Sequence, residues 1–340
     1  MTALQRPKAE RERGMRKIRW GILGTGAIAH KFATGIAACA DAELAAVGSR
    51  RQETAEKFGS EFHIPRRHAS YESLAADPEV DAVYVSTPHP MHKENSILCL
   101  KAGKAVLCEK PFTINAEGAR EVIRLARKKK VFLMEAMWAR FQPVQVKVRE
   151  MLAAGAIGEA RMVQSDFGFR TEVNPKGRLF DPELGGGALL DVGVYNLALA
   201  SMIFGTPRDV KALAHLGETG VDEEAAVILG YEGGRLAVST TAVRTQTAHE
   251  AAIFGTTGWI RIDKPWWRAN GLVLTVHGKG DTHIETPMTS NGYNYEAEEV
   301  MSCLRAGKLE SAAMPLDETL SIMKTMDKIR AQWGLEYPME

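Results

Sequence analysis

The stretch Arg19–Arg51, RWGILGTGAIAHKFATGIAACADAELAAVGSRR, decides how the chain folds. Ile18–Leu23 is an apolar run of strand length, and a tight turn of small residues follows it directly. Apolar side chains then recur at four-residue spacing from Ile28 to Ile36, which predicts a helix with one apolar face. Leu44–Val47 is a second short apolar run. The stretch therefore predicts a strand, a tight turn, a helix and a second buried strand.

The turn reads GTGAIA and has the spacing of a dinucleotide-binding fingerprint. Gly24 allows the sharp turn, and Gly26 lets the backbone approach a pyrophosphate without a Cβ in the way. The helix that starts near Ala27 and Ile28 offers free N–H groups and a positive dipole end to phosphate. A GxGxxA motif alone is weak evidence, but between a strand and a helix it is specific. We therefore expect these four residues to bind a dinucleotide.

The end of the second strand indicates which dinucleotide is bound. NAD sites usually place Asp or Glu there to hold the ribose 2′-OH. This chain instead has Ser49 and Arg50, followed by Arg51. A hydroxyl and a guanidinium suit a 2′-phosphate, because arginine pairs with phosphate through two parallel N–H groups. We expect NADP(H), with NAD(H) as the other possibility.

Composition limits the classes of protein to consider. The chain has 340 residues, 45% hydrophobic and 25% charged, with a net charge of +1. The length allows two domains, and the charge argues against a nucleic-acid surface. The four cysteines have no CxxC spacing, which favours a reducing compartment, so we expect a cytoplasmic protein. Residues 1–15 lack the apolar core of a signal peptide and are expected to be a disordered tail. We expect no membrane span, because Asp191 and Asn196 interrupt the most apolar stretch, Ala188–Phe204.

From residue 52 to residue 137 short apolar runs alternate with longer amphipathic ones. The expected strands are 66–69, 81–86, 104–108 and 131–134, and the expected helices are 52–61, 90–102 and 115–130. Such alternation predicts an α/β Rossmann domain with a doubly wound parallel sheet. We place this domain at residues 16–137.

Two of the turns that follow these strands carry unusual residues. One is Thr87-Pro88-His89-Pro90-Met91-His92, and the other is Glu109-Lys110-Pro111. Ligands of open α/β sheets bind at the carboxyl ends of the strands, so we expect Thr87, Pro88, His89, His92, Glu109 and Lys110 to face the cofactor. A metal site at the two histidines has no third cluster to support it, and none is expected.

Beyond residue 138 the pattern changes to period-two segments. After a helix at 142–154, the expected strands are 161–169, 210–215, 225–231, 235–241, 251–254, 259–262 and 272–276. Short strands joined by tight turns predict a large, mostly antiparallel open sheet, which makes this half α+β. Between the first two strands, GGGALLDVGVY opens a helix on which Asp191 and Tyr195 share one face. We assign residues 138–340 to substrate binding and oligomerisation, with closing helices at 293–306 and 317–333. In this assignment the last of these helices can pack back on the first domain.

Four motifs together resemble one known family. GTGAIA, STPHPMH, CEKPF and GGGALLDVGVY occur in the order of the glucose–fructose oxidoreductase / inositol dehydrogenase family, Gfo/Idh/MocA. The resemblance covers the chain from Arg16 to its end. MEAMWARFQP, Met134–Pro143, is similar to the branch of dimeric dihydrodiol dehydrogenases and NADP-dependent D-xylose 1-dehydrogenases.

The resemblance implies a chemistry and a set of site residues. It implies hydride transfer between nicotinamide and a hydroxyl-bearing carbon of a sugar or cyclic diol. Lys110 matches the family lysine at the reacting carbon, Tyr195 the acid–base position and Asp191 the carboxylate beside them. Inositol dehydrogenases have His at the tyrosine position, which speaks against inositols. The resemblance also places Trp138, Arg140 and Phe167 in the substrate pocket, and it implies a sheet that pairs with a partner subunit as a homodimer or higher homo-oligomer.

Two other functions remain open at this point. One is a sugar oxidoreductase that retains its NADP(H) between turnovers. The other is a non-catalytic dinucleotide-binding regulator, against which the intact Lys110, Asp191 and Tyr195 argue. The sequence leaves the sugar or diol, the physiological direction and the choice between dimer and tetramer undecided.

Overall fold

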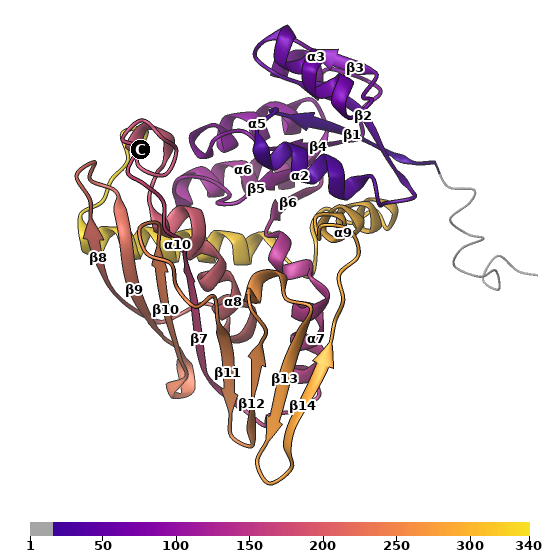
Figure 1. The fold of residues 1–340 in the computed structure, drawn as a ribbon. Coiled ribbons are helices and arrows are strands. Elements are labelled where there is room, and N and C mark those ends of the chain that lie inside the picture. Colours follow the sequence, from indigo (N-terminus) through magenta and orange to yellow (C-terminus); the bar gives the residue numbers. More distant parts are fainter. Residues whose placement is uncertain (1–15) are drawn as a thin grey trace, which may run out of the picture.

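The structure is a computed structural model that describes residues 16–340. The tail expected at residues 1–15 lies outside this range. Two sheets, side by side in Figure 1, organise the described part of the chain.

The first sheet has six strands in the order β3-β2-β1-β4-β5-β6, and every pairing is parallel. Its strands are β1 (Ile18–Leu23), β2 (Ala42–Gly48), β3 (Arg66–His68), β4 (Ala82–Val85), β5 (Ala105–Glu109) and β6 (Leu133–Ala136). The chain runs outward from β1 in one direction and returns through β4 in the other. The switch point between β1 and β4 is where such sheets bind ligands. The predicted doubly wound parallel sheet is confirmed.

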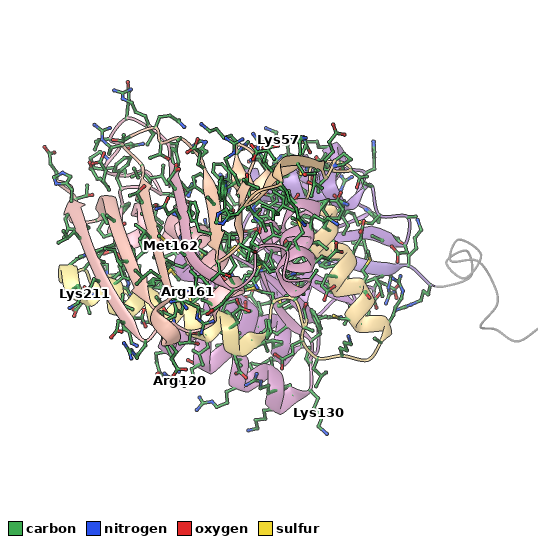
Figure 2. The ribbon with its side chains drawn as sticks, turned by 90° about the horizontal axis from the view of Figure 1, so that it is seen from below. Lys57, Arg120, Lys130, Arg161, Met162 and Lys211 are labelled. Atoms are coloured by element: carbon green, nitrogen blue, oxygen red, sulfur yellow. The ribbon has the colours of Figure 1, made fainter. Side chains whose placement is uncertain are left out.

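Helices connect these strands and cover the sheet. They are α2 (Ala27–Ile36), α3 (Gln52–Glu61), α4 (Tyr71–Ala75), α5 (His92–Lys101) and α6 (Ala116–Lys129). Right-handed crossovers in the two directions put helices on both faces. Asn115 caps α6 through a 2.9 Å bond from Gly118 N to its side-chain oxygen. Figure 2 shows Arg120 and Lys130 projecting from this helix and its end, away from the protein body.

The second sheet has eight strands in the order β14-β13-β12-β11-β7-β10-β9-β8. The strands are β7 (Ala160–Gly168), β8 (Asp209–Leu216), β9 (Asp222–Gly230), β10 (Leu236–Ala242), β11 (Ala251–Gly255), β12 (Gly258–Ile262), β13 (Gly271–Val276) and β14 (Gly280–Glu285). Only the β7–β10 pairing is parallel. The predicted mostly antiparallel sheet is confirmed, and β14 is an additional edge strand.

Helices pack against one face of this sheet. They are α7 (Pro143–Ala153), α8 (Val194–Phe204) and α10 (Leu316–Trp333), whereas α9 (Asn294–Arg305) packs against α2 of the first sheet. Helix α10 lies along β8 and also reaches α6 of the first sheet, where its Asp327 carboxylate accepts a 2.9 Å bond from Ala116 N. The last helix thus packs back on the first sheet and ties the two halves together.

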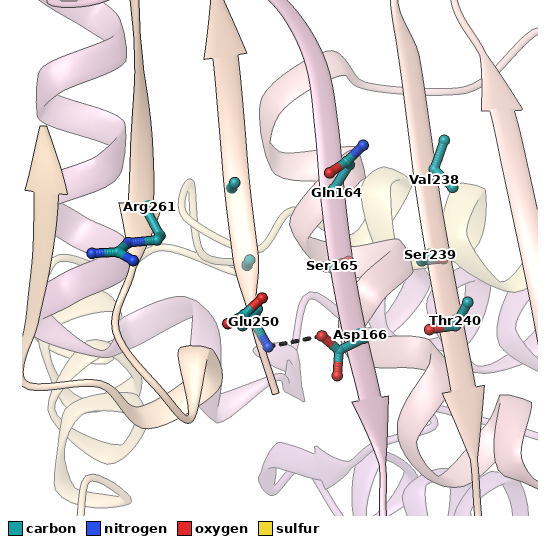
Figure 3. A pocket seen from close by; sticks show the side chains of 10 residues that line it. Gln164, Ser165, Asp166, Val238, Ser239, Thr240, Glu250 and Arg261 are labelled. Carbon is teal, nitrogen blue, oxygen red and sulfur yellow. Dashed lines mark hydrogen bonds between the residues drawn. The ribbon is translucent and has the colours of Figure 1, made fainter. Parts of the chain in front are cut away.

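The other face of the second sheet is open in this chain. Leu213 on β8 is 80% exposed and Ile228 on β9 is 48% exposed. A shallow groove of about 260 Å³ crosses β10, β7, β11 and β12 on this face. Figure 3 shows Val238 on β10, Gln164 on β7 and Arg261 on β12, with β11 between the last two, and Glu250 N bonded to the Asp166 carboxylate at 2.9 Å. A broad sheet face that no helix of residues 16–340 covers is a candidate surface for a partner.

Helix α8 is preceded by one π-helical turn, Leu189–Gly193. The combined stretch Pro182–Phe204 is long and apolar enough to cross a membrane, but 83% of its apolar window is buried inside the protein. Its apolar surface is therefore already covered by the two sheets and their helices. This buried helix carries Asp191 and Tyr195.

Candidate active site

The turn after β1 is shaped to receive an anionic ligand. Gly24 has a φ of +106°, in the region that favours glycine, and a Cβ there would meet Ser86 at 3.0 Å. A Cβ on Gly26 would meet nothing within 4 Å, so the space beside it is open. Helix α2 has no acidic residue in its first turn and no side-chain cap, which leaves its first N–H groups free for a phosphate.

This turn opens onto a cavity of about 360 Å³. The cavity is lined by Gly26, Ala27, Ile28, Lys31, Ser86, Thr87, Pro88, His89, His92, Glu109, Lys110, Arg178, Leu184 and Asp191. Most of these residues are the ones that the sequence predicts at the cofactor. Lys31, Ser86, Arg178 and Leu184 are additions, and the last two come from a loop of the second domain. The cavity therefore lies where the two halves of the protein meet.

The 2′-phosphate end of the site lies beyond this cavity. Ser49 follows β2, and its hydroxyl is 2.5 Å from that of Thr54 in α3. Arg50 is exposed and lies beside the Tyr71 hydroxyl. Burial raises the pKa of this hydroxyl, and Arg50 opposes part of the increase. A hydroxyl pair and an exposed guanidinium at the end of β2 fit a phosphate better than a ribose hydroxyl.

The turn after β4 is held by His92. Its two ring nitrogens lie 2.8 Å from the backbone oxygens of Thr87 and Pro111, and Asn95 donates to the Thr87 hydroxyl at 3.0 Å. His89 lies 3.2 Å from the Gly185 oxygen through Nδ1. Within residues 16–340 there is no group of His, Cys, Asp and Glu that would hold a metal. These histidines therefore shape the wall of the cavity.

Lys110 stands at the end of β5, held there by Glu109. The Glu109 carboxylate accepts a 3.1 Å bond from Lys110 N and a short bond from the Tyr84 hydroxyl. Burial raises the pKa of Glu109, and the Lys110 ammonium opposes the shift. Because both Glu109 oxygens have donors, the lysine backbone has one fixed position at the sheet edge.

The Lys110 ammonium meets Asp191 of the second domain. Nζ donates to the Asp191 backbone oxygen at 2.7 Å and lies 3.5 Å from its Oδ1. Arg178 donates to the same Oδ1 at 2.8 Å. Burial alone would raise the pKa of Asp191, but the two cations hold it well below its usual range. The carboxylate is therefore ionised at neutral pH.

Tyr195 lies one helical turn further along the buried helix. Lys110 Nζ is 5.0 Å from the centroid of its ring, and Trp138 Nε1 donates to its hydroxyl at 2.7 Å. Burial and the Glu109 carboxylate raise the pKa of Tyr195 well above its ordinary value. A nearby ammonium favours the phenolate, but Lys110 does not outweigh the burial and the Glu109 charge.

Aromatic side chains surround Tyr195. Phe167 is 5.4 Å from Tyr195 between ring centroids and stacks on Trp267 at 3.5 Å. Trp138 stacks on Tyr293 at 4.7 Å. Phe167 and Trp138 are predicted pocket residues, whereas Trp267 and Tyr293 are additions from distant parts of the sequence. These rings place a wall of flat apolar surface around the phenol.

Arg140 lies behind this wall. We expect it in the substrate pocket from the resemblance, but it is 5% exposed and bonded to Glu318 at 2.7 Å and to the Ala198 oxygen at 2.9 Å. A third bond runs to the Ala313 oxygen at 3.1 Å. The guanidinium thus joins helices α8 and α10, and we leave Arg140 out of the site proposed below.

Sequence comparison identifies relatives over almost the whole chain. A family model described as oxidoreductase family, NAD-binding Rossmann fold, matches residues 18–137, and the GFO/IDH/MocA C-terminal domain matches residues 146–261. The trans-1,2-dihydrobenzene-1,2-diol dehydrogenase of Xenopus laevis is 39% identical over 94% of this chain and 99% of its own length. The enzyme of the same name from Homo sapiens is 36% identical over 95% and 99%.

Solved structures with the same fold include an aldose oxidoreductase and a ketoreductase. The aldose-aldose oxidoreductase of Caulobacter crescentus, complexed with glycerol, has a TM-score of 0.84 at 26% identity over 94% of this chain and 99% of its own. A 3-ketoreductase from Actinomadura kijaniata, crystallised with NADP and TDP-benzene, has a TM-score of 0.79 at 25% identity over 93% and 97%. On the matches to both of its domains and to full-length relatives, the chain belongs to the Gfo/Idh/MocA family of oxidoreductases.

Proposed function

We propose that the protein is an NADP(H)-dependent oxidoreductase that acts on a hydroxyl-bearing carbon of a sugar or cyclic diol. One observation carries the proposal. Lys110 lines the dinucleotide cavity and lies against both Asp191 and the ring of Tyr195. A cation, a carboxylate and a phenol at that point are the groups that an alcohol–carbonyl interconversion needs.

The residues of the first domain fit the cofactor. Gly24, Gly26, Ala27 and Ile28 leave an open helix end for the pyrophosphate, and Ser49 and Arg50 offer donors to a 2′-phosphate. Thr87, Pro88, His89, His92 and Glu109 form the wall along which the nicotinamide half would lie. Bound NADP(H) would supply the hydride acceptor or donor. The NADP-bound 3-ketoreductase with this fold supports the same choice.

In the proposed mechanism Tyr195 transfers the proton, and Lys110 stabilises the negative charge on the substrate oxygen. When a carbonyl is reduced, negative charge collects on its oxygen, and the Lys110 ammonium stabilises that charge. The Tyr195 phenol then donates its proton to the oxygen. Because the pKa of Tyr195 is raised, the phenol is protonated at neutral pH and is already in its acid form. In the oxidative direction the phenolate is the base, so that rate rises with pH.

A second assignment gives the proton to Lys110 and leaves Tyr195 to position the substrate. Two observations support this second assignment: Tyr195 is buried, and its hydroxyl already accepts a hydrogen bond from Trp138. Asp191 fixes the lysine in both versions, through its backbone oxygen and its carboxylate.

The substrate class follows from the lining of the site. Trp138 and Phe167 present flat apolar faces, which suit the ring of a cyclic diol or the apolar face of a sugar. The dihydrodiol dehydrogenase relatives and the aldose oxidoreductase support these two classes. A sugar oxidoreductase that retains NADP(H) is the other candidate, and cofactor retention through purification separates the two.

We also propose that the protein works as a homodimer or higher homo-oligomer in the cytoplasm. The open face of the second sheet, with Leu213 and Ile228 exposed, supports the pairing. The domain boundary proposed at residues 137 and 138 places the Rossmann half on one side and this sheet on the other.

A substrate panel tests the function. Purified protein is mixed with NADP⁺ or NAD⁺ and with aldopentoses, aldohexoses and a trans-dihydrodiol, and nicotinamide absorbance is followed. We expect turnover with NADP⁺ on at least one sugar or diol. Cofactor binding without turnover on any of them, in either direction, would instead support a dinucleotide-binding regulator.

A further inference from the structure

Two cations share the Asp191 carboxylate, and the closer of them is not the lysine. Arg178 Nη1 is 2.8 Å from Oδ1 and Nη2 is 3.5 Å from Oδ2. Lys110 Nζ is 3.5 Å from Oδ1, and its short bond of 2.7 Å goes to the backbone oxygen. The closer ion pair of the carboxylate is therefore the one with Arg178.

Two cations lie against the Asp191 carboxylate. Asp191 brings one negative charge on a side chain that is 8% exposed, while Lys110 and Arg178 bring two positive charges. The groups that face the cluster are His89 on the 3-10 turn after β4, Glu109 on β5, Tyr195 on α8, and Tyr293 and Glu296 at the start of α9. Burial keeps His89 neutral by lowering its pKa to about 3, and it raises the pKa of Glu296 and of Tyr293. The Glu109 carboxylate also faces Lys110, and it accepts hydrogen bonds from Tyr84 and from the lysine backbone.

Packing does not explain the position of Arg178. Its side chain is 60% exposed at the edge of the dinucleotide cavity, on the loop between β7 and the buried helix. Phe180, which is 2% exposed, is the residue that anchors this loop in the core. Arg178 thus contributes little buried area, and its distinctive feature is the pair with Asp191.

We propose that Arg178 is a positioning residue that acts through Asp191 to leave the Lys110 charge available to the reacting oxygen. By pairing with the carboxylate, it allows the Lys110 ammonium to stay on the Asp191 backbone oxygen beside the Tyr195 ring. This inference rests on the proposed function of Lys110 and Tyr195.

Loss of Arg178 has a definite consequence. Asp191 then has a single cation, and a buried carboxylate draws that cation into a direct ion pair. The Lys110 ammonium then pairs with Asp191, so it stabilises neither an alkoxide on the substrate nor the Tyr195 phenolate. In the oxidative direction the rate depends on the fraction of Tyr195 that is phenolate. The increase of this rate with pH should therefore move to higher pH.

The test compares Arg178→Met, Arg178→Lys and Arg178→Met in an Asp191→Asn background with the wild type. Each is assayed for oxidative kcat across pH and for NADPH binding by fluorescence. Lys176→Met is the matched control, since it removes a cation from the same loop and Lys176 forms no ion pair within residues 16–340. Wild-type turnover tests the proposed function separately.

We expect Arg178→Met to lower kcat about tenfold at neutral pH and to move the pH limb up by roughly one unit, with NADPH affinity retained. Arg178→Lys should restore part of the rate, and Arg178→Met should add little to Asp191→Asn. An unshifted pH limb in Arg178→Met overturns the inference. A loss that adds fully to that of Asp191→Asn also overturns it, because Arg178 would then act directly on substrate or cofactor.

Discussion

Trp138 Nε1 donates a hydrogen bond of 2.7 Å to the phenolic oxygen of Tyr195. The tryptophan follows the last strand of the Rossmann sheet, and the tyrosine lies in the first turn of α8. The bond therefore crosses between the two halves of the protein. Since the indole occupies one lone pair of the phenol oxygen, the phenol proton has to point elsewhere, and the cavity side is where a substrate oxygen would accept it.

Trp138→Phe should weaken catalysis without loss of the aromatic wall. The variant keeps a ring against Tyr293 and removes only the N–H that favours the phenolate. We expect oxidative kcat to fall roughly threefold to tenfold, the worth of one ordinary hydrogen bond. The pH limb should move upward while NADPH binding is unchanged. A shift of KM alone would show that the indole only packs against the substrate.

Tyr195→Phe decides which group moves the proton. The change keeps the ring over which Lys110 lies and removes the hydroxyl. If the phenol is the acid–base, kcat should fall by roughly 10²–10⁴. If kcat stays within a few-fold and KM rises, the proton belongs to Lys110. Lys110→Met is the companion variant, and it should be severely impaired on either account while NADPH still binds. Near-normal turnover in Lys110→Met would contradict both assignments.

The fold was largely predictable because its sheets follow simple burial rules. Strands buried on both faces, such as Val83–Val85 in β4, have continuous apolar sequences. Strand β14, Gly280–Glu285, escaped prediction because it is a polar edge strand with five exposed residues. Helix α4 also escaped, since five residues are too few for a periodic pattern.

The site was predictable only where a local motif marks it. Lys110 and Asp191 are flanked by proline and glycines that fix the backbone, so their positions stand out in the sequence. Arg178 has no such signal: it is one exposed loop arginine among several, and only the folded chain places it on Asp191. Arg140 shows the opposite case, because it lies next to a motif but its guanidinium is bonded to Glu318.

Arg50→Ala tests the choice of cofactor. The guanidinium is exposed at the end of β2, where a 2′-phosphate would sit, and a charge-assisted bond to phosphate is worth about 1.5–3 kcal/mol. We expect the Kd for NADPH to rise by roughly tenfold or more while the Kd for NADH changes little. Arg51→Ala, one residue on, is the control. Equal loss of both cofactors would mean that Arg50 only stacks on the adenine.

Glu135→Gln should make stability less dependent on pH. Glu135 lies in β6 and is buried, and burial raises its pKa from 4.5 to about 7, against the opposing effects of Thr319 and Arg140. Because the folded state holds the Glu135 proton more tightly than the unfolded state does, this carboxyl favours the folded state at pH values below its unfolded-state pKa. This stabilisation is lost as pH rises through about 7, its folded-state pKa. The Tm of the wild type should therefore fall between about pH 5 and pH 8, and less so in the variant. An identical fall in both proteins would assign the effect elsewhere, for example to Asp222, whose pKa burial also raises to about 7.

The open sheet face should hold the subunits together. Ile228 on β9 lies beside Val238 on β10, and both side chains are on the face that no helix covers. A glutamate there would place a charge in the middle of an isologous contact, where it meets its own symmetry copy. Ile228→Glu should therefore give monomers by light scattering at micromolar concentration, whereas the wild type is at least a dimer. Leu309→Glu is the control, since Leu309 is similarly exposed at 41% but lies between α9 and α10. A wild type that is monomeric at that concentration would refute the pairing, and a dimer that survives Ile228→Glu would place the interface on another surface.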